Sequence, residues 1–141
     1  MTNPIELSAA DDAASTRVVV SVCTTCKTQD TAAAVVGPEL LATLREVVTP
    51  GEGIAVRAVQ CLGVCKRPTT AAVSGPDRYT FVFADLQPAE GATALRDFAI
   101  SYTRSDYGLV PWRERAQVLR RGMIARIPPA IWSPDNGEPP K

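Results

Sequence analysis

The hydrophobic and polar positions along the chain follow two different periods, and these predict four strands and two helices. β-branched or apolar runs bounded by turn residues predict strands at residues 17–22, 54–60, 69–74 and 78–84. Apolar residues recur at helical spacing in residues 38–48 and 88–102, which indicates two amphipathic helices. The face of the second helix that we expect to be buried carries Ala92, Leu95, Phe98, Ala99 and Tyr102. The pattern is therefore that of an α/β domain.

The order of these elements is strand–helix–strand followed by strand–strand–helix. Gly75-Pro76-Asp77 joins the last two strands tightly enough for a hairpin. We expect a mixed four-stranded sheet in which strands 17–22 and 54–60 are parallel, because a helix connects them. The predicted organisation is a flexible tail (1–16), the α/β domain (17–104), an Arg/Trp-rich C-terminal extension with a short helix (105–132) and a disordered tail (133–141).

All the cysteines of the chain occur in two close pairs, and each pair follows a predicted strand. The spacings are C-x2-C and C-x3-C, formed by Cys23, Cys26, Cys61 and Cys65. Loops at the same end of a sheet bring such residues together, and four thiolates at one point form a metal or cluster site. The chain has no histidine, so no imidazole is available as a ligand. The candidates are a [2Fe–2S] cluster, a zinc ion (Zn²⁺) or a redox dithiol.

Pair spacing favours the [2Fe–2S] cluster among these candidates. A cluster is wider than a single ion, so each unequal pair can hold one iron. Gly63 allows backbone amides to approach the sulfurs, and Lys27, Lys66 and Arg67 follow the pairs closely enough to oppose the negative charge of a cluster. Zinc stays open as the alternative, although zinc ribbons more often repeat C-x2-C.

A thiol oxidoreductase is the other alternative. The dithiol Cys23/Cys26 after a first strand and before a helix has the thioredoxin arrangement. That chemistry leaves Cys61 and Cys65 without a role. Burial as small hydrophobic residues does not explain two pairs placed at strand ends.

These motifs also carry a resemblance to known families. The succession VCTTC, helix, VQCLGVCKRP, hairpin and helix resembles thioredoxin-like [2Fe–2S] ferredoxins, among them a small subunit of NADH-quinone oxidoreductase. Over residues 18–130, including PWRERAQVLRRGMIARIPP, the chain resembles a bacterial family of predicted metal-binding proteins of unknown function. The ferredoxins usually separate the first two cysteines more widely. The resemblance implies a thioredoxin-like fold with Cys23, Cys26, Cys61 and Cys65 as ligands.

Composition narrows the function classes. The 15 basic and 15 acidic side chains cancel, so we expect no nucleic-acid partner. No apolar run is long enough for a membrane span, and the polar N-terminus lacks a secretory signal, so we expect a cytoplasmic protein with reduced thiols and no membrane partner. The sequence has no convincing nucleophile–base pair and no phosphate loop. We therefore expect an electron carrier or metal-binding protein and not an enzyme.

The C-terminal extension is locally basic. We predict that Arg113, Arg115, Arg120 and Arg121, beside Trp112, recognise an acidic surface on a redox partner protein or on a second copy of the chain, giving a homodimer. A solvated helix packed on the domain is the simpler interpretation of the same residues.

Overall fold

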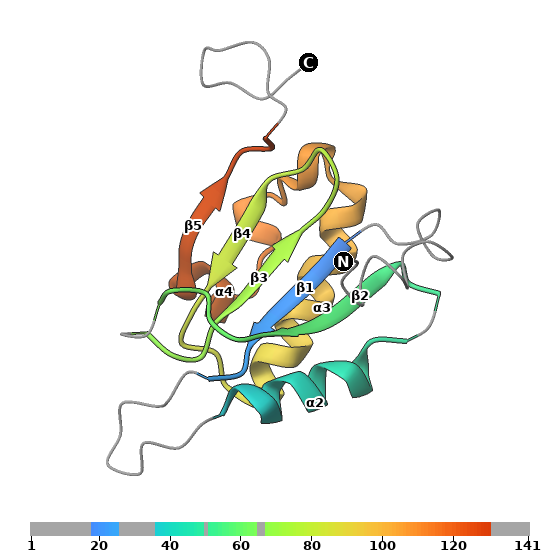
Figure 1. Ribbon diagram of the computed structural model, residues 1–141. Helices are drawn as coiled ribbons and strands as arrows, with labels where there is room; N and C mark the ends of the chain where they lie inside the picture. Colours follow the sequence, from blue (N-terminus) through green and yellow to red (C-terminus); the bar gives the residue numbers. More distant parts are fainter. Residues whose placement is uncertain (1–17, 26–35, 50, 65–66, 131–141) are drawn as a thin grey trace, which may run out of the picture.

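The computed structural model describes residues 18–25, 36–49, 51–64 and 67–130, which form a mixed sheet covered by helices. The strand order is β2-β1-β3-β4-β5 (Figure 1). The strands are β1 (Val18–Cys23), β2 (Ile54–Val59), β3 (Ala71–Ser74), β4 (Thr80–Phe83) and β5 (Met123–Ile127). β1 and β2 are parallel, and the other neighbouring strands are antiparallel. The predicted parallel pair and the predicted hairpin are both confirmed.

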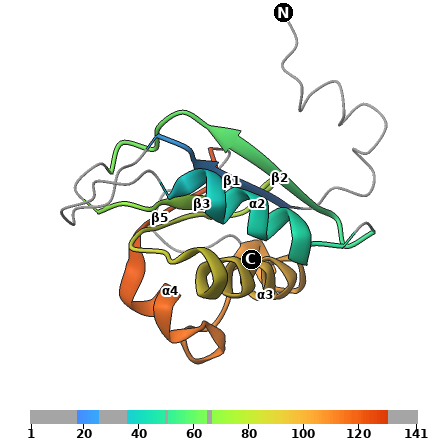
Figure 2. The same ribbon diagram turned by 90° about the horizontal axis from the view of Figure 1, so that it is seen from below.

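The helices lie on one face of this sheet, as the view along its edge shows (Figure 2). They are α2 (Gly37–Val47), α3 (Pro88–Arg104) and the short α4 (Gln117–Gly122), with single 3-10 turns η1 (Asp106–Gly108) and η2 (Trp112–Glu114). Proline at the start of α2 and of α3 suits a first turn, where its missing N–H has no partner to lose. Within the described residues, no helix combines the length and the apolar character that crossing a membrane requires.

The core forms between the helices and alternate residues of the strands. Val18, Val20 and Val22 are fully buried, as the two-residue period of a strand requires. The predicted buried face of α3 is confirmed, since all five of its residues are at most 3% exposed. Burial of a large apolar side chain such as Leu95 or Phe98 contributes roughly 1.5–3 kcal/mol to the free energy of unfolding. Four aromatic rings pack together in this core: Phe81 and Phe83 are nearly parallel, Phe98 packs edge to face against both, and Tyr102 packs edge to face against Phe81 and tilted against Phe98.

The predicted count of four strands is wrong, because the described part of the chain forms a sheet of five. Met123–Ile127, which we assigned to the C-terminal extension, pairs with β4 as an edge strand. Gly122 makes the junction possible: its carbonyl accepts the N–H of Ala84 at 2.7 Å, and a Cβ there would lie 2.4 Å from the carbonyl oxygen of Ala84. The extension therefore completes the sheet. Residues 1–16 and 133–141, predicted to be tails, lie outside the described residues.

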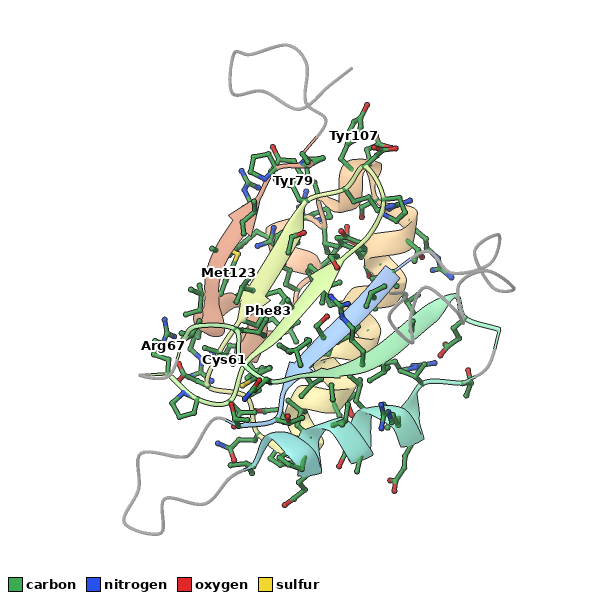
Figure 3. The ribbon with its side chains drawn as sticks, in the orientation of Figure 1. Cys61, Arg67, Tyr79, Phe83, Tyr107 and Met123 are labelled. Carbon is green, nitrogen blue, oxygen red and sulfur yellow. The ribbon has the colours of Figure 1, made fainter. Side chains whose placement is uncertain are left out.

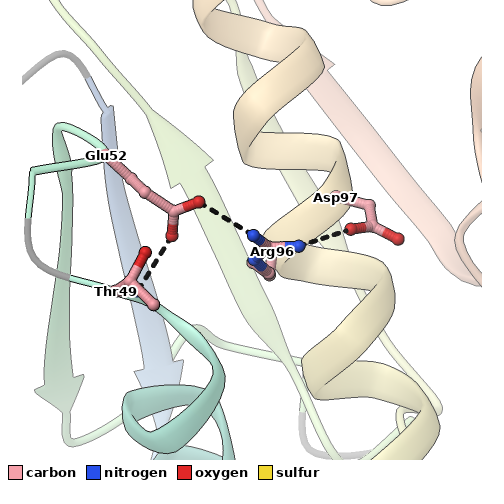
Figure 4. Close-up of polar contacts among 4 residues, drawn as sticks. All are labelled: Thr49, Glu52, Arg96 and Asp97. Atoms are coloured by element: carbon pink, nitrogen blue, oxygen red, sulfur yellow. Dashed lines mark hydrogen bonds and ion pairs between the residues drawn. The ribbon is translucent and has the colours of Figure 1, made fainter.

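A polar contact fixes the loop between α2 and β2 on α3 (Figure 4). Glu52 accepts the backbone N–H of Thr49 and an N–H of Arg96, each at 2.9 Å, and Arg96 also contacts Asp97 at 3.3 Å. The Thr49 N–H and the Arg96 guanidinium hold the pKa of Glu52 below its usual value. This contact lies at the N-terminal end of β2, away from Cys23 and Cys61 at the other end of the strands.

Candidate metal centre

Parallel pairing of β1 and β2 brings the first cysteine of each pair to one end of the sheet. Cys23 is the last residue of β1 and is aligned with Val59, the last residue of β2. Cys61 follows two residues later. Adjacent parallel strands that end together place their following loops side by side. The structure therefore places Cys23 and Cys61, which are 38 positions apart in sequence, at the same end of the sheet.

The interior residues of the first pair bind the end of β2. The N–H and the hydroxyl of Thr24 both donate to the carbonyl oxygen of Val59, at 2.9 and 3.2 Å. The hydroxyl of Thr25 donates to the carbonyl oxygen of Gln60. The Sγ of Cys23 donates to the same oxygen at 3.6 Å. The sequence analysis missed Thr24 and Thr25, for which the only signal was hydroxyl residues inside a cysteine pair.

The two cysteine sulfurs that the structure describes lie in different environments. Cys23 is fully buried, whereas Cys61 is exposed. The N–H of Gly63 donates to the Sγ of Cys61 at 3.2 Å. Gly63 has φ +79°, a conformation that L side chains rarely adopt, so glycine is required for this contact. The expectation that Gly63 lets a backbone amide reach a sulfur is confirmed.

Close packing also fixes the start of α2 against the first cysteine. A Cβ on Gly37 would lie 1.9 Å from the carbonyl oxygen of Cys23. No other residue type fits there without moving α2 or the end of β1. Gly37 directly precedes the helix predicted at residues 38–48, and its contact with Cys23 depends on the tertiary fold.

Two arginines bring positive charge to this end of the sheet. Arg67 contacts Asp85 with its Nη2 and Nε at 2.6 and 3.0 Å, and Nη2 reaches the carbonyl oxygen of Arg121 at 3.4 Å. Arg57 donates to the hydroxyl of Ser21 at 2.6 Å on the sheet face that also carries Cys23. Ser21 lies two positions before Cys23 in β1, which corresponds to about 7 Å along the strand. Figure 3 shows Arg67 and Cys61 at one end of the sheet, and Tyr79 and Tyr107 at the opposite end.

The structure describes two of the four predicted ligands, Cys23 and Cys61. Cys26 and Cys65, and the cations Lys27 and Lys66, lie outside the described residues. Within residues 18–25, 36–49, 51–64 and 67–130, no group of three or more Cys, Asp or Glu side chains has the geometry for a metal ion. Cys23 and Cys61 do fit a thiophilic group: they are sulfur donors at the ends of adjacent parallel strands, and one already accepts an amide N–H.

The C-terminal arginines divide into two kinds. Arg115 is buried: its Nε and Nη2 donate to the carbonyl oxygen of Val110 at 3.0 and 2.8 Å, and its guanidinium lies over the Phe81 ring. Burial lowers the pKa of Arg115. Arg113 and Arg121 are exposed, and Arg120 is partly exposed. Of the four arginines predicted to recognise a partner, Arg115 instead has a structural role.

A cavity of about 560 Å³ lies at the opposite end of the sheet, beside the β3–β4 turn and the end of α3. Arg78 lines it, but this guanidinium is engaged with the carbonyl oxygens of Tyr102 at 2.6 Å and Ser105 at 3.2 Å. Neither Cys23 nor Cys61 lines this cavity, so we do not assign it to the candidate metal centre.

The chain belongs to the family described as Protein of unknown function (DUF1636), whose model matches residues 20–129. No curated protein matches the chain. Among solved structures, a thioredoxin-like [2Fe–2S] ferredoxin from Aquifex aeolicus matches with a TM-score of 0.54 at 13% identity. The match covers 83% of this chain and 99% of the ferredoxin. This likeness confirms the predicted thioredoxin-like fold.

Proposed function

We propose that this chain holds a [2Fe–2S] cluster on Cys23, Cys26, Cys61 and Cys65 and transfers single electrons. The observation that carries the proposal is the alignment of Cys23 with the end of β2, next to Cys61. The family name assigns no function, so the proposal rests on these residues and on the fold shared with a ferredoxin.

The surroundings of the two sulfurs favour this function over a thiol oxidoreductase. A cysteine that attacks disulfides must be reachable, and catalytic cysteines lie in partly exposed positions. Cys23, the first residue of the C-x2-C pair, is fully buried. The amide hydrogen bond to Cys61 is typical of the contacts that tune the potential of a cluster.

When bound, the cluster would supply a one-electron acceptor and donor. The residues of the chain hold and shield it. Burial of Cys23 excludes water from one side, the N–H of Gly63 stabilises negative charge on the sulfur of Cys61, and Arg57 adds a cation on the same sheet face. The Gly63 N–H and the Arg57 cation would favour the more negative, reduced state, whereas burial at Cys23 would oppose it.

The proposed electron partner carries an acidic surface. Arg113 and Arg121 are exposed, and the contact of Arg67 with the carbonyl oxygen of Arg121 links α4 to the cysteine end of the sheet. Such charges steer an encounter without supplying most of its affinity. A second copy of the chain is the alternative partner, which sedimentation at several protein concentrations distinguishes. The reduced cytoplasm is the compartment that suits this chemistry.

Metal and sulfide analysis beside the visible spectrum tests the proposal. Protein purified without oxygen should contain iron and acid-labile sulfide in equal amounts and absorb visible light, and this absorption should bleach on reduction by one electron. Colourless protein with one zinc ion per chain would establish the zinc alternative. Colourless, metal-free protein that reduces disulfides would establish the thiol oxidoreductase.

Charge variants test the partner surface. The double variant Arg113→Gln/Arg121→Gln should react more slowly with the anionic oxidant ferricyanide, and the difference should shrink as salt screens the charges. Arg45→Gln, an exposed arginine on α2, is the matched control. Equal rates for the double variant and the control at low salt would remove the steering role.

A further inference from the structure

The carbonyl oxygen of Gln60 accepts two hydrogen bonds from the first cysteine loop. One comes from the Sγ of Cys23 at 3.6 Å and the other from the hydroxyl of Thr25. The neighbouring carbonyl oxygen of Val59 also accepts two, and both come from Thr24. These four contacts join the loop after β1 to the end of β2.

Metal binding affects the two carbonyl groups differently. A sulfur that binds a metal no longer carries a hydrogen, so Cys23 stops donating to Gln60. Among the described residues, Thr25 is then the remaining donor to that oxygen. The two contacts from Thr24 to Val59 involve no sulfur and persist.

The same change makes the sulfur of Cys23 an acceptor. Its Sγ lies 3.9 Å from the hydroxyl oxygen of Thr25. This hydroxyl is therefore within hydrogen-bond reach of both the carbonyl oxygen of Gln60 and the sulfur of Cys23. Thr25 therefore sits where it can hold the loop and also face the ligand sulfur.

We propose that Thr25 is a positioning residue, which holds the first cysteine loop on the end of β2 once Cys23 binds a metal. The inference rests on the proposed function only in that Cys23 is a ligand, and it holds for a cluster and for zinc. Thr25 is exposed, so water can satisfy the oxygen of Gln60 in its absence. A water molecule in place of the hydroxyl would not tie the first cysteine loop to the end of β2, so the position of Cys23 as a ligand would be less well fixed.

A comparison of two threonines in the same loop tests this. In the metal-free protein, Thr24→Val and Thr25→Val each remove one of two hydrogen bonds to a carbonyl oxygen, so both should lower the melting temperature similarly, by about 3–5 °C. With Zn²⁺ as the probe, measured by competition with a chelator, Thr25→Val should weaken binding about tenfold or more. Thr24→Val should stay within about threefold of the wild type, and Thr25→Ser should restore its affinity, because serine keeps the hydroxyl.

Equal losses of zinc affinity in Thr24→Val and Thr25→Val would overturn the proposal, and so would a failure of Thr25→Ser to restore binding. If Thr25→Val does not fold, Thr25→Ala removes the hydroxyl without placing a methyl against Gln60 and gives the same comparison. Iron and sulfide content is measured separately. A wild-type chain that binds zinc but takes up no iron and sulfide refutes the proposed cluster and leaves the zinc comparison intact, whereas binding of neither metal overturns both.

Discussion

Arginine side chains have different surroundings at the cysteine end of the sheet and in the aromatic layer. In the aromatic layer (Phe81, Phe83, Phe98 and Tyr102), Arg78 and Arg115 lie over rings and donate to backbone carbonyl oxygens. At the cysteine end, Arg67 is about half exposed and paired with Asp85, and Cys61 is open to solvent. In the aromatic layer, the buried Arg115 and the partly buried Arg78 bind backbone oxygens, whereas the cysteine end keeps Arg67 and Cys61 accessible to solvent.

Local stability should differ in the same way. The aromatic layer is closed by ring packing and by the hydroxyl of Tyr102, which donates to the carbonyl oxygen of Tyr79. A Cβ on Gly108 would lie 2.2 Å from the Tyr102 ring, so even the backbone of η1 is packed against it. The cysteine end depends on the few hydrogen bonds of Thr24, Thr25 and Gly63. Substitutions in the two regions should therefore separate stability from metal binding.

The largest expected effect is on metal binding, from Cys61→Ser. Loss of one of four thiolates should reduce iron and sulfide content to below about a tenth of wild type, because structural sites of this kind need all their ligands. The metal-free protein should keep its stability within about 0.5 kcal/mol, since Cys61 is exposed. Iron analysis and urea unfolding measure the two quantities. A Cys61→Ser protein with full iron and sulfide would contradict the four-thiolate site.

The next largest effect is on stability, from Arg115→Gln. Removing this guanidinium leaves the carbonyl oxygen of Val110 without two donors and should lower the free energy of unfolding by roughly 1–3 kcal/mol. The exposed Arg113→Gln should stay within about 0.5 kcal/mol. Urea unfolding of both variants makes the comparison. Equal stability of the two would show that the buried arginine contributes no more than an exposed one.

We expect the buried hydroxyl of Tyr102 to make the protein less stable at alkaline pH. Burial raises the pKa of Tyr102 far above its usual value of about 10. Because the folded pKa is raised, the contribution of the neutral phenol is fully present below about pH 10 and is lost as pH rises above it, by up to about 1.4 kcal/mol per pH unit. Urea unfolding between pH 9 and 11 measures this slope, and Tyr102→Phe should reduce it. An unchanged slope in Tyr102→Phe would assign the alkaline transition to other groups.

The smallest expected effect concerns the potential of the proposed cluster, from Arg57→Gln. Loss of a cation about 7 Å along the sheet from Cys23 should disfavour the reduced state by roughly 1 kcal/mol or less, which is about 40 mV for one electron. Redox titration against Arg45→Gln, an exposed arginine on α2, measures the shift to lower potential. A potential equal to that of the control would show that Arg57 serves only to bind Ser21.

Most of the fold follows from the sequence, because local periodicity reports which side of each element is buried. The Val-rich run of β1 and the apolar face of α3 mark a strand and a helix that bury the same residues in the structure. The connecting helix made β1 and β2 parallel, and this in turn predicts that the cysteine pairs share one end of the sheet. The sequence also singled out Cys23 and Cys61 as candidate ligands, and Gly63 as the residue that lets an amide approach a sulfur.

Only the tertiary structure decided the rest. Met123–Ile127 is a short, arginine-containing segment before two prolines, and it becomes a strand because the edge of β4 offers unpaired backbone groups. The role of Arg115 depends on the carbonyl oxygen of Val110 and the ring of Phe81, and that of Thr25 on the carbonyl oxygen of Gln60. Local sequence encodes burial through periodicity, but it does not encode which distant backbone groups a polar side chain will meet. The folded chain alone makes those pairings.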